Sequence, residues 1–255
     1  MAGYSTIVFD KRDDIAWVTL NRPEQLNAYN MKMRDELHQA FSAIYDDTEV
    51  RAMVLAGAGP AFSTGGDVSE FGMAPSPIVA RWVRFRRDVW GLLRRMPIPT
   101  IAAVHGYTVG GGLEMMLLCD FAVAGEDARF SLPETGLGMI PGVAGTQTLP
   151  RRGGLAHALD LCITGRWIDA AEALRVGLVG EVVPTQMLDR AAETMARRVS
   201  RLPKTIIALA KFAVWEGLDM SLPSALDLER RLAVRLNPAS ALAHPNDPGL
   251  WRSPG

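Results

Sequence analysis

Cysteine and histidine are scarce in this chain of 255 residues, which has two of the former and four of the latter. Cys119 and Cys162 are not in a CxxC spacing and have apolar neighbours, so they indicate reduced core residues of a cytoplasmic protein rather than a disulfide framework. The histidines form no HExxH pattern and no cluster with cysteine, so we expect no bound metal. The chain is long enough to build a hydrophobic core without disulfides or metal sites.

A large excess of charge and long hydrophobic runs are also lacking. Lys and Arg total 27 against 28 Asp and Glu, a net charge of -1, which disfavours nucleic-acid binding through bulk charge and leaves a local basic patch open. No stretch approaches the ~18 uninterrupted apolar residues of a membrane-spanning helix. Asp10 interrupts the segment where a signal peptide would need an apolar run. We therefore expect no membrane partner.

Short strand patterns alternate with helical patterns over most of the chain, which predicts an α/β fold with largely parallel strands. The predicted strands are Ile15–Leu20, Ala52–Ala56, Thr100–Val104 and Phe121–Ala124, and the predicted helices between them are Met31–Tyr45, Ile78–Met96 and one containing Leu113–Cys119. Near Pro184 the pattern becomes helical only, with segments at Asp189–Arg201, Lys204–Trp215 and Ser221–Leu236. We therefore divide the chain into a core of residues 1–186 and a helical region of residues 187–255 with an irregular tail.

The first segment that indicates chemistry is HGYTVGGGLEMMLLCD, residues 105–120. Three glycines, Gly110 to Gly112, directly precede an apolar helix, so a ligand can approach the free N–H groups of its first turn. A carbonyl oxygen that becomes negative would be stabilised there. Glu114 enters mostly apolar surroundings in that turn. The alternative is that the glycines only form a turn and that Glu114 complements the helix dipole.

Two further segments add polar groups at the ends of predicted strands. In PAFSTGGDVSEF, residues 60–71, Gly65 and Gly66 can present N–H groups, and Asp67 with Glu70 has the spacing of a capping box; the alternative is a surface turn before a capped helix. In FSLPETGLGMIPGVAGTQTLPRRGG, residues 130–154, Glu134 is a second carboxylate with apolar flanks, which general acid–base chemistry could use. The alternative for Glu134 is a salt bridge in a loop.

Taken together, these segments resemble the enoyl-CoA hydratase/isomerase (crotonase) family. The matching stretches lie in the family's order over residues 19–184: LNRPEQLNA, AFSTGGDVSEF, AAVHGYTVGGGLEMMLLCD, FSLPETGLGMIPGVAGTQTLPRRGG and ITGRWIDAAEALRVGLVGEVVP. The resemblance implies a spiral of ββα units followed by a helical region that forms a homotrimer or a dimer of trimers. It also implies an acyl-CoA thioester as substrate, so that coenzyme A is part of the substrate and no separate cofactor is needed.

The resemblance assigns roles to particular residues. The amides of Gly66 and Gly111 match the two donors that hold the thioester oxygen, and Glu114 and Glu134 match the two glutamates of the hydratases. Glu114 would help to activate the water that attacks C3, and Glu134 would deliver a proton to C2. The stretches that line the CoA path are matched by Ala28, Gly66, Asp67, Val68 and Ser69.

Two stretches depart from the family pattern. Ser69 stands where hydratases often carry a lysine, and the closing sequence RLNPASALAHPNDPGLWRSPG does not match the family's final helix. Because Leu250 and Trp251 are large apolar groups, the segment Asn237–Gly255 either docks on a protein surface in place of that helix or is a disordered end.

The resemblance leaves the activity open between two classes. Because both glutamates are present, we expect an enzyme that hydrates a 2-enoyl-CoA; an enoyl-CoA isomerase or a specialised acyl-CoA dehydratase is the alternative of the same class. A low-activity CoA-thioester or RNA-binding relative is the alternative of another class. The predicted helix at Ile78–Met96 is amphipathic with a basic face, which is either solvated or meets a CoA phosphate while Trp82 or Phe85 lines the acyl pocket.

Overall fold

The computed structural model describes residues 3–236, with the side chains of residues 83–85 excepted, and the tail hypothesis for residues 237–255 falls outside this range. The chain forms two compact units, of which the first ends at Lys204 and the second begins at Thr205. Helix α7 (Leu188–Ser200) belongs to the first unit, where it packs on the sheet. The division into an active-site region to residue 186 and an oligomerisation region beyond it stays a prediction.

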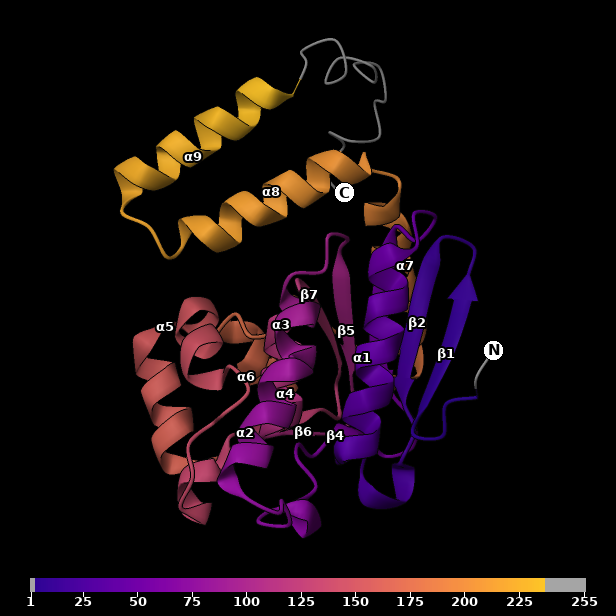
Figure 1. The fold of residues 1–255 in the computed structure, drawn as a ribbon, viewed down its shortest axis with the longest axis vertical. Helices are drawn as coiled ribbons and strands as arrows, with labels where there is room; N and C mark the ends of the chain where they lie inside the picture. Colours follow the sequence, from indigo (N-terminus) through magenta and orange to yellow (C-terminus); the bar gives the residue numbers. More distant parts are fainter. Residues whose placement is uncertain (1–2, 237–255) are drawn as a thin grey trace. The chain divides into compact units, whose positions relative to one another are not determined.

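The first unit is built on a six-stranded sheet with the order β1-β2-β3-β5-β7-β10 (Figure 1). Only β1 and β2 are antiparallel; the other neighbours in this sheet are parallel. The strands are β1 (Ile7–Arg12), β2 (Ile15–Leu20), β3 (Ala52–Gly57), β5 (Thr100–Val104), β7 (Phe121–Gly125) and β10 (Glu181–Val183). The four predicted strands are therefore present, and the expected parallel pairing is confirmed.

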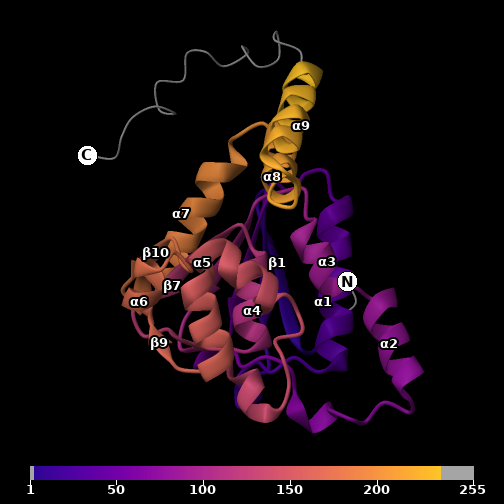
Figure 2. The same cartoon turned by 90° about the vertical axis from the view of Figure 1, so that its left-hand side faces the viewer.

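The two faces of this sheet are covered by different helices because successive side chains of a strand point to opposite faces. On β2, Ala16 and Val18 join the core cluster that includes α1, α3 and α4, whereas Ile15 and Trp17 join the cluster that includes α7. The helices on the first face are α1 (Met31–Asp46), α3 (Val89–Arg94) and α4 (Gly111–Leu118). Figure 2 shows α7 on one side of the sheet and α1 with α3 on the other.

A smaller sheet of four short strands has the order β4-β6-β8-β9. Its strands are β4 (Ala61–Ser63), β6 (Tyr107–Val109), β8 (Arg129–Ser131) and β9 (Ile168–Asp169). Each of the first three follows a strand of the larger sheet after a short connection, and helices follow in turn, so the chain repeats a β-β-α unit. This arrangement is the spiral of ββα units that the sequence predicted.

The remaining helices of the first unit connect these repeats. They are α2 (Pro77–Arg86), α5 (Gly145–Thr164) and α6 (Ala170–Arg175), with 3-10 turns η1 (Pro23–Gln25), η2 (Val68–Glu70), η3 (Pro133–Leu137) and η4 (Thr185–Met187). Helix α5 is kinked at Gly154, whose φ of 78° and ψ of 164° are not helical.

The single helix predicted for Ile78–Met96 is wrong. The chain leaves the helix after Arg86, and Asp88 caps a second helix because its side chain accepts a 2.9 Å hydrogen bond from the amide of Gly91. The expected apolar stripe is divided accordingly: Val89 and Leu93 are buried in the core, whereas Ile78 and Trp82 are exposed. The side chain of Phe85 is outside the described part of the structure.

The second unit is described up to residue 236. In this part, α8 (Lys204–Gly217) begins at the last residue of the first unit and α9 (Leu222–Arg235) follows a short turn. A Cβ on Gly217 would lie 3.5 Å from Cβ of Ala225. Several large apolar side chains of these helices are exposed, among them Phe212, Val214, Leu222 and Val234. Within residues 3–236, no helix is both long and apolar enough to cross a membrane.

Candidate active site

Two glycine amides of neighbouring loops form the centre of the candidate site. Gly111 is the first residue of α4, so its N–H has no partner within that helix. Gly66 follows β4, and a Cβ built on the preceding Gly65 would lie 2.8 Å from the nitrogen of Gly111. Among the described residues we find no acceptor for the amide of Gly66 or of Gly111. The two loops therefore offer two main-chain donors to a ligand.

Glycine is required where these loops meet. Gly65 has a φ of 89° and Gly110 a φ of 53°, which are left-handed values that glycine adopts readily. A Cβ on Gly110 would also lie 2.7 Å from Oε1 of Glu134. The predicted glycine-rich turns therefore allow both the backbone conformation and the close approach of a carboxylate.

Glu114 is fixed at the amino end of a second helix. It lies on α4 with 1% of its surface exposed, and its Oε1 accepts hydrogen bonds from the amides of Val143 (2.9 Å), Ala144 (2.8 Å) and Gly145 (2.6 Å). These amides open α5, where the helix dipole favours a negative charge. The carboxylate thus complements the amino end of α5. Glu114 also lies in the first turn of α4, the position that the alternative of complementing its own helix dipole requires.

Glu134 lies in a less polar place on the 3-10 turn η3. Its Oε2 is buried without a hydrogen-bond partner, and the described residues give the carboxylate no ion pair, so they do not support the alternative of a loop salt bridge. Burial raises the pKa of Glu134, and the charge of Glu114 raises it further. Burial likewise raises the pKa of the Cys162 thiol, with added contributions from both glutamates. The charges of the two predicted carboxylates therefore act on each other and on the Cys162 thiol.

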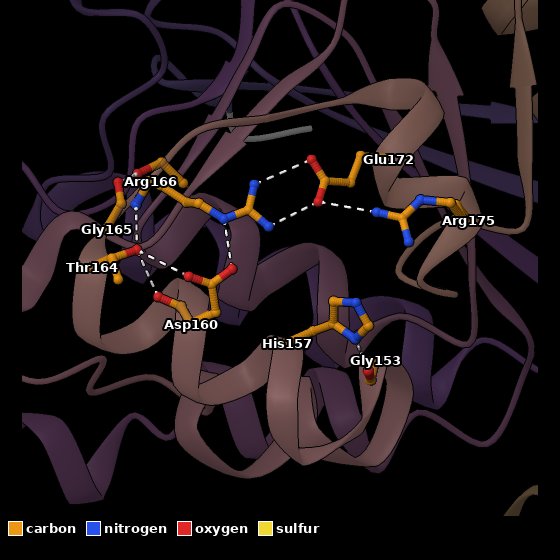
Figure 3. A network of polar contacts seen from close by, with 9 residues as sticks. Gly153, His157, Asp160, Thr164, Gly165, Arg166, Glu172 and Arg175 are labelled. Carbon is orange, nitrogen blue, oxygen red and sulfur yellow. Dashed lines mark hydrogen bonds and ion pairs between the residues drawn. The ribbon is translucent and has the colours of Figure 1, made fainter.

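A polar network joins α5, the turn after it and α6 (Figure 3). The guanidinium of Arg166 donates to Asp160 (2.6 Å) and, in a fork, to both oxygens of Glu172 (2.8 and 3.1 Å). This fixes the end of α5 and the turn after it. There the carbonyl of Gly165 accepts a hydrogen bond from Ser131 (2.7 Å), and that of Ile163, in the last turn of α5, accepts one from Thr135 (3.1 Å). Both flanks of Glu134 are thereby attached to the end of α5.

The loop that precedes α1 is attached to the site by Asn27 and Arg22. The Asn27 side chain is buried, donates to the carbonyls of Ala58 and Ala61 (both 2.8 Å) and accepts from the amide of Arg22 (2.8 Å). The guanidinium of Arg22 donates to the carbonyl of Ala28 and to the carboxylate of Asp67 (2.9 Å). The stretches around Ala28 and Asp67, both predicted to line the CoA path, are therefore linked by one side chain.

The predicted capping box at Asp67 is only partly present. Asp67 caps η2 by accepting from the amide of Ser69 (3.2 Å), and its hydrogen bonds to Ser69 and Arg22 lower its pKa. Glu70 does not complete the box, because it accepts from the amide of Met31 (2.8 Å) while the amide of Asp67 donates to Tyr29. Val68 and Ser69 lie on the exposed side of this turn, and Val68 is 66% exposed.

Sequence reasoning missed two features of the site. The first is the set of three amides that bind Glu114. They are main-chain groups, so no side chain in the sequence marks them, and the available signal was the apolar and glycine-containing stretch that leads into α5. Tyr29, beside the matched motif LNRPEQLNA, lies against Gly111, and its aromatic ring was the available signal. Within the described residues, no group of three His, Cys, Asp or Glu side chains could hold a metal ion.

Comparison with known proteins identifies the family. The profile of the enoyl-CoA hydratase/isomerase family matches residues 10–241. The chain belongs to this family. The fold, the order of the motifs and the two glycine loops thus have a common origin in the enoyl-CoA hydratase/isomerase family.

Individual relatives agree with this membership. The chain is 39% identical over 229 residues to a probable enoyl-CoA hydratase of Mycobacterium bovis, covering 90% of this chain and 88% of the relative. It is 37% identical over 227 residues to the short-chain-enoyl-CoA hydratase of Clostridium acetobutylicum, covering 88% and 87% of the two chains. The crystal structure of an enoyl-CoA hydratase from Bacillus anthracis superposes with a TM-score of 0.85 at 34% identity, covering 90% of each chain.

Proposed function

We propose that this chain is a hydro-lyase that adds water reversibly to a 2-enoyl-CoA and forms a 3-hydroxyacyl-CoA. The observation that carries the proposal is the carboxylate of Glu134 beside Gly110, directly before the amide of Gly111, together with the buried Glu114 on the helix that begins there. A protein that only binds acyl-CoA has no need of two carboxylates next to an anion-binding site. The names of the relatives support the same reaction.

The carboxylates divide the proton transfers. Glu114, held through Oε1, takes a proton from water as the water oxygen bonds to C3. The π electrons of the C2=C3 bond move toward the thioester, whose oxygen becomes negative and is stabilised by the amides of Gly66 and Gly111. Glu134, whose raised pKa favours the protonated form, gives a proton to C2. The net change places OH on C3 and H on C2, and proton exchange restores both carboxyl groups.

The loops around the glycines form the proposed path of coenzyme A. Ala28, Gly66, Asp67, Val68 and Ser69 bind it, and the Arg22 link between Ala28 and Asp67 holds the two walls of this path together. The exposure of Val68 and Ser69 leaves this rim accessible to a ligand.

We further propose a homotrimer or a dimer of trimers in the cytoplasm. The exposed apolar side chains of α8 and α9, which include Phe212 and Leu222, support association with further copies of the chain. The free thiols of Cys119 and Cys162 agree with a reducing compartment. Light scattering of the purified protein measures the assembly directly, and a monomer would contradict this proposal.

A direct assay tests the activity. The purified protein is mixed with crotonyl-CoA and with a longer 2-enoyl-CoA, and the loss of the conjugated-thioester absorbance is followed. Glu114→Gln and Glu134→Gln should each reduce turnover by ~10²–10⁴-fold, and the double variant should lose less than the product of the two. Glu229→Gln on the exposed face of α9 is the control.

The same assay separates the alternatives. Acyl-CoA binding without turnover of any substrate would indicate a CoA-thioester-binding protein. Conversion of a 3-enoyl-CoA with no hydration of a 2-enoyl-CoA would indicate an isomerase. Hydration at the wild-type rate by one of the glutamine variants would remove that glutamate from the mechanism.

A further inference from the structure

Tyr29 lies beside both glycines of the anion-binding site. A Cβ built on Gly111 would lie 2.8 Å from Cε1 and 3.0 Å from Cζ of Tyr29. The hydroxyl oxygen of Tyr29 would be nearer to this Cβ than either ring carbon. The same hydroxyl oxygen is 3.7 Å from the Cβ position of Gly66. One phenol oxygen therefore contacts the Cβ positions of both residues whose amides are proposed to hold the thioester oxygen.

Hydrogen bonds of its main chain fix the position of Tyr29. Its amide donates to the carbonyl of Gly65 (2.8 Å), and its carbonyl accepts from the amide of Asp67 (3.0 Å), so that it pairs with Gly66 as a short parallel bridge. The next residue, Asn30, caps α1 by accepting from the amide of Met33 (2.9 Å). Tyr29 is thus attached to both the glycine loop and the first helix.

The ring of Tyr29 is fixed as well. It makes an edge-to-face contact with the ring of Trp90, with centroids 5.0 Å apart and an angle of 63° between the planes. Trp90 lies on α3 and is only 8% exposed, so it is held by the core. A phenol on such a support keeps its hydroxyl in one place without a reorganisation cost during the reaction.

We propose that the Tyr29 hydroxyl is a third hydrogen-bond donor to the thioester oxygen. This hydrogen bond becomes stronger when the oxygen gains the negative charge of the enolate. The inference deepens the proposed hydration and rests on it. The two glutamates can only accept hydrogen bonds when ionised, whereas a phenol is neutral near pH 7 and donates. A side chain that served only to fill space beside the glycines would need the ring and not the hydroxyl.

Tyr29→Phe is the decisive variant because it removes the hydroxyl and retains the ring that packs on Trp90. We expect kcat for hydration of crotonyl-CoA to fall by about 10²-fold, the usual effect of deleting one oxyanion donor, with little change in KM. Tyr45→Phe is the matched control, because Tyr45 is exposed on α1 and away from these loops in the sequence, and its kinetics should equal those of the wild type.

A second measurement reports the negative oxygen itself. Acetoacetyl-CoA has an acidic C2–H between two carbonyl groups and forms an enolate with its own near-ultraviolet absorbance. The pH at which half of the bound acetoacetyl-CoA is enolate should be higher in Tyr29→Phe than in the wild type and unchanged in Tyr45→Phe. A role limited to packing would leave this midpoint where it is, even if the variant were less stable.

The outcomes separate the two proposals. Tyr29→Phe with wild-type kcat, or with an unchanged enolate midpoint, overturns the third donor and leaves the hydratase intact. A wild-type protein that neither hydrates a 2-enoyl-CoA nor binds acetoacetyl-CoA overturns the proposed function and, with it, the role of Tyr29.

Discussion

The carboxylate of Glu134 occupies the space that a side chain on Gly110 would fill: Oε1 is 2.7 Å from that Cβ position. Gly110 precedes α4 and therefore sets the direction in which the amide of Gly111 points. The position of the proposed acid is thus coupled to the direction of the Gly111 amide, one of the proposed donors to the thioester oxygen.

Gly110→Ala should damage the enzyme in two ways. The added methyl group would displace Glu134, and the φ of 53° with ψ of -127° would be strained by about 1–3 kcal/mol. We expect a lower melting temperature and a fall in kcat of at least tenfold. Gly136→Ala, on the turn η3 that carries Glu134, is the control, because a Cβ on Gly136 meets nothing within 4 Å. Equal activity of the two variants would show that Glu134 does not depend on Gly110.

Glu134→Gln should change how stability depends on pH. The folded protein holds the pKa of Glu134 above its ordinary value of 4.5, so the wild type loses stability as pH rises from about that value through the raised pKa. The glutamine variant does not ionise there. Its melting temperature relative to the wild type should therefore rise between pH 4 and pH 8, as measured by thermal unfolding. If the difference in melting temperature between the variant and the wild type is the same at every pH in this range, ionisation of Glu134 does not destabilise the folded protein.

Glu114→Ala should be less stable than Glu114→Gln. The glutamine oxygen can still accept from the amides at the start of α5, whereas alanine leaves these three donors, of which that of Gly145 is buried, without this partner. The free energy of unfolding should be lower in the alanine variant by about 1–3 kcal/mol, measured by urea denaturation. Equal stability of the two variants would show that water replaces the carboxylate at no cost.

Arg166→Lys should weaken the network of Figure 3, because a lysine cannot bind both oxygens of Glu172 in a fork while also reaching Asp160. These groups are partly exposed, so we expect a loss of less than about 1 kcal/mol, together with a reduced kcat through the segment that holds Glu134. Arg175→Lys, which removes a more exposed member of the network, should have the smaller effect. A larger loss of stability and kcat in Arg175→Lys than in Arg166→Lys would exclude Arg166 as a support of the site.

The long elements of the fold could be predicted because their sequences are periodic. The strand at Ile15–Leu20 and the helix from Met31 were found with the same first residues as in the structure. The small sheet could not be found, because strands of two or three residues such as β8 and β9 carry no measurable alternation. The break at Asp88 was missed because apolar spacing continues across a cap that depends on one side-chain hydrogen bond.

The site was partly open to prediction for a similar reason. Gly66, Gly111, Glu114 and Glu134 stand in motifs that resemble a known family. The structure places Glu134 against Gly110, directly before α4, and Glu114 on α4 itself. The partner of Glu70 and the position of Tyr29 depend on contacts between segments that are far apart in sequence or joined by loops. Such contacts have no period, so local patterns cannot reveal them.

The two proposed donors to the thioester oxygen belong to the main chain at Gly66 and Gly111, and this has a consequence for how such an enzyme can diverge. A substitution changes a side chain, and apart from proline it leaves the N–H group in place. Residues that surround the acyl group can therefore be exchanged while these two main-chain donors are inherited unchanged. The site is a stable starting point from which selection can alter substrate preference one residue at a time.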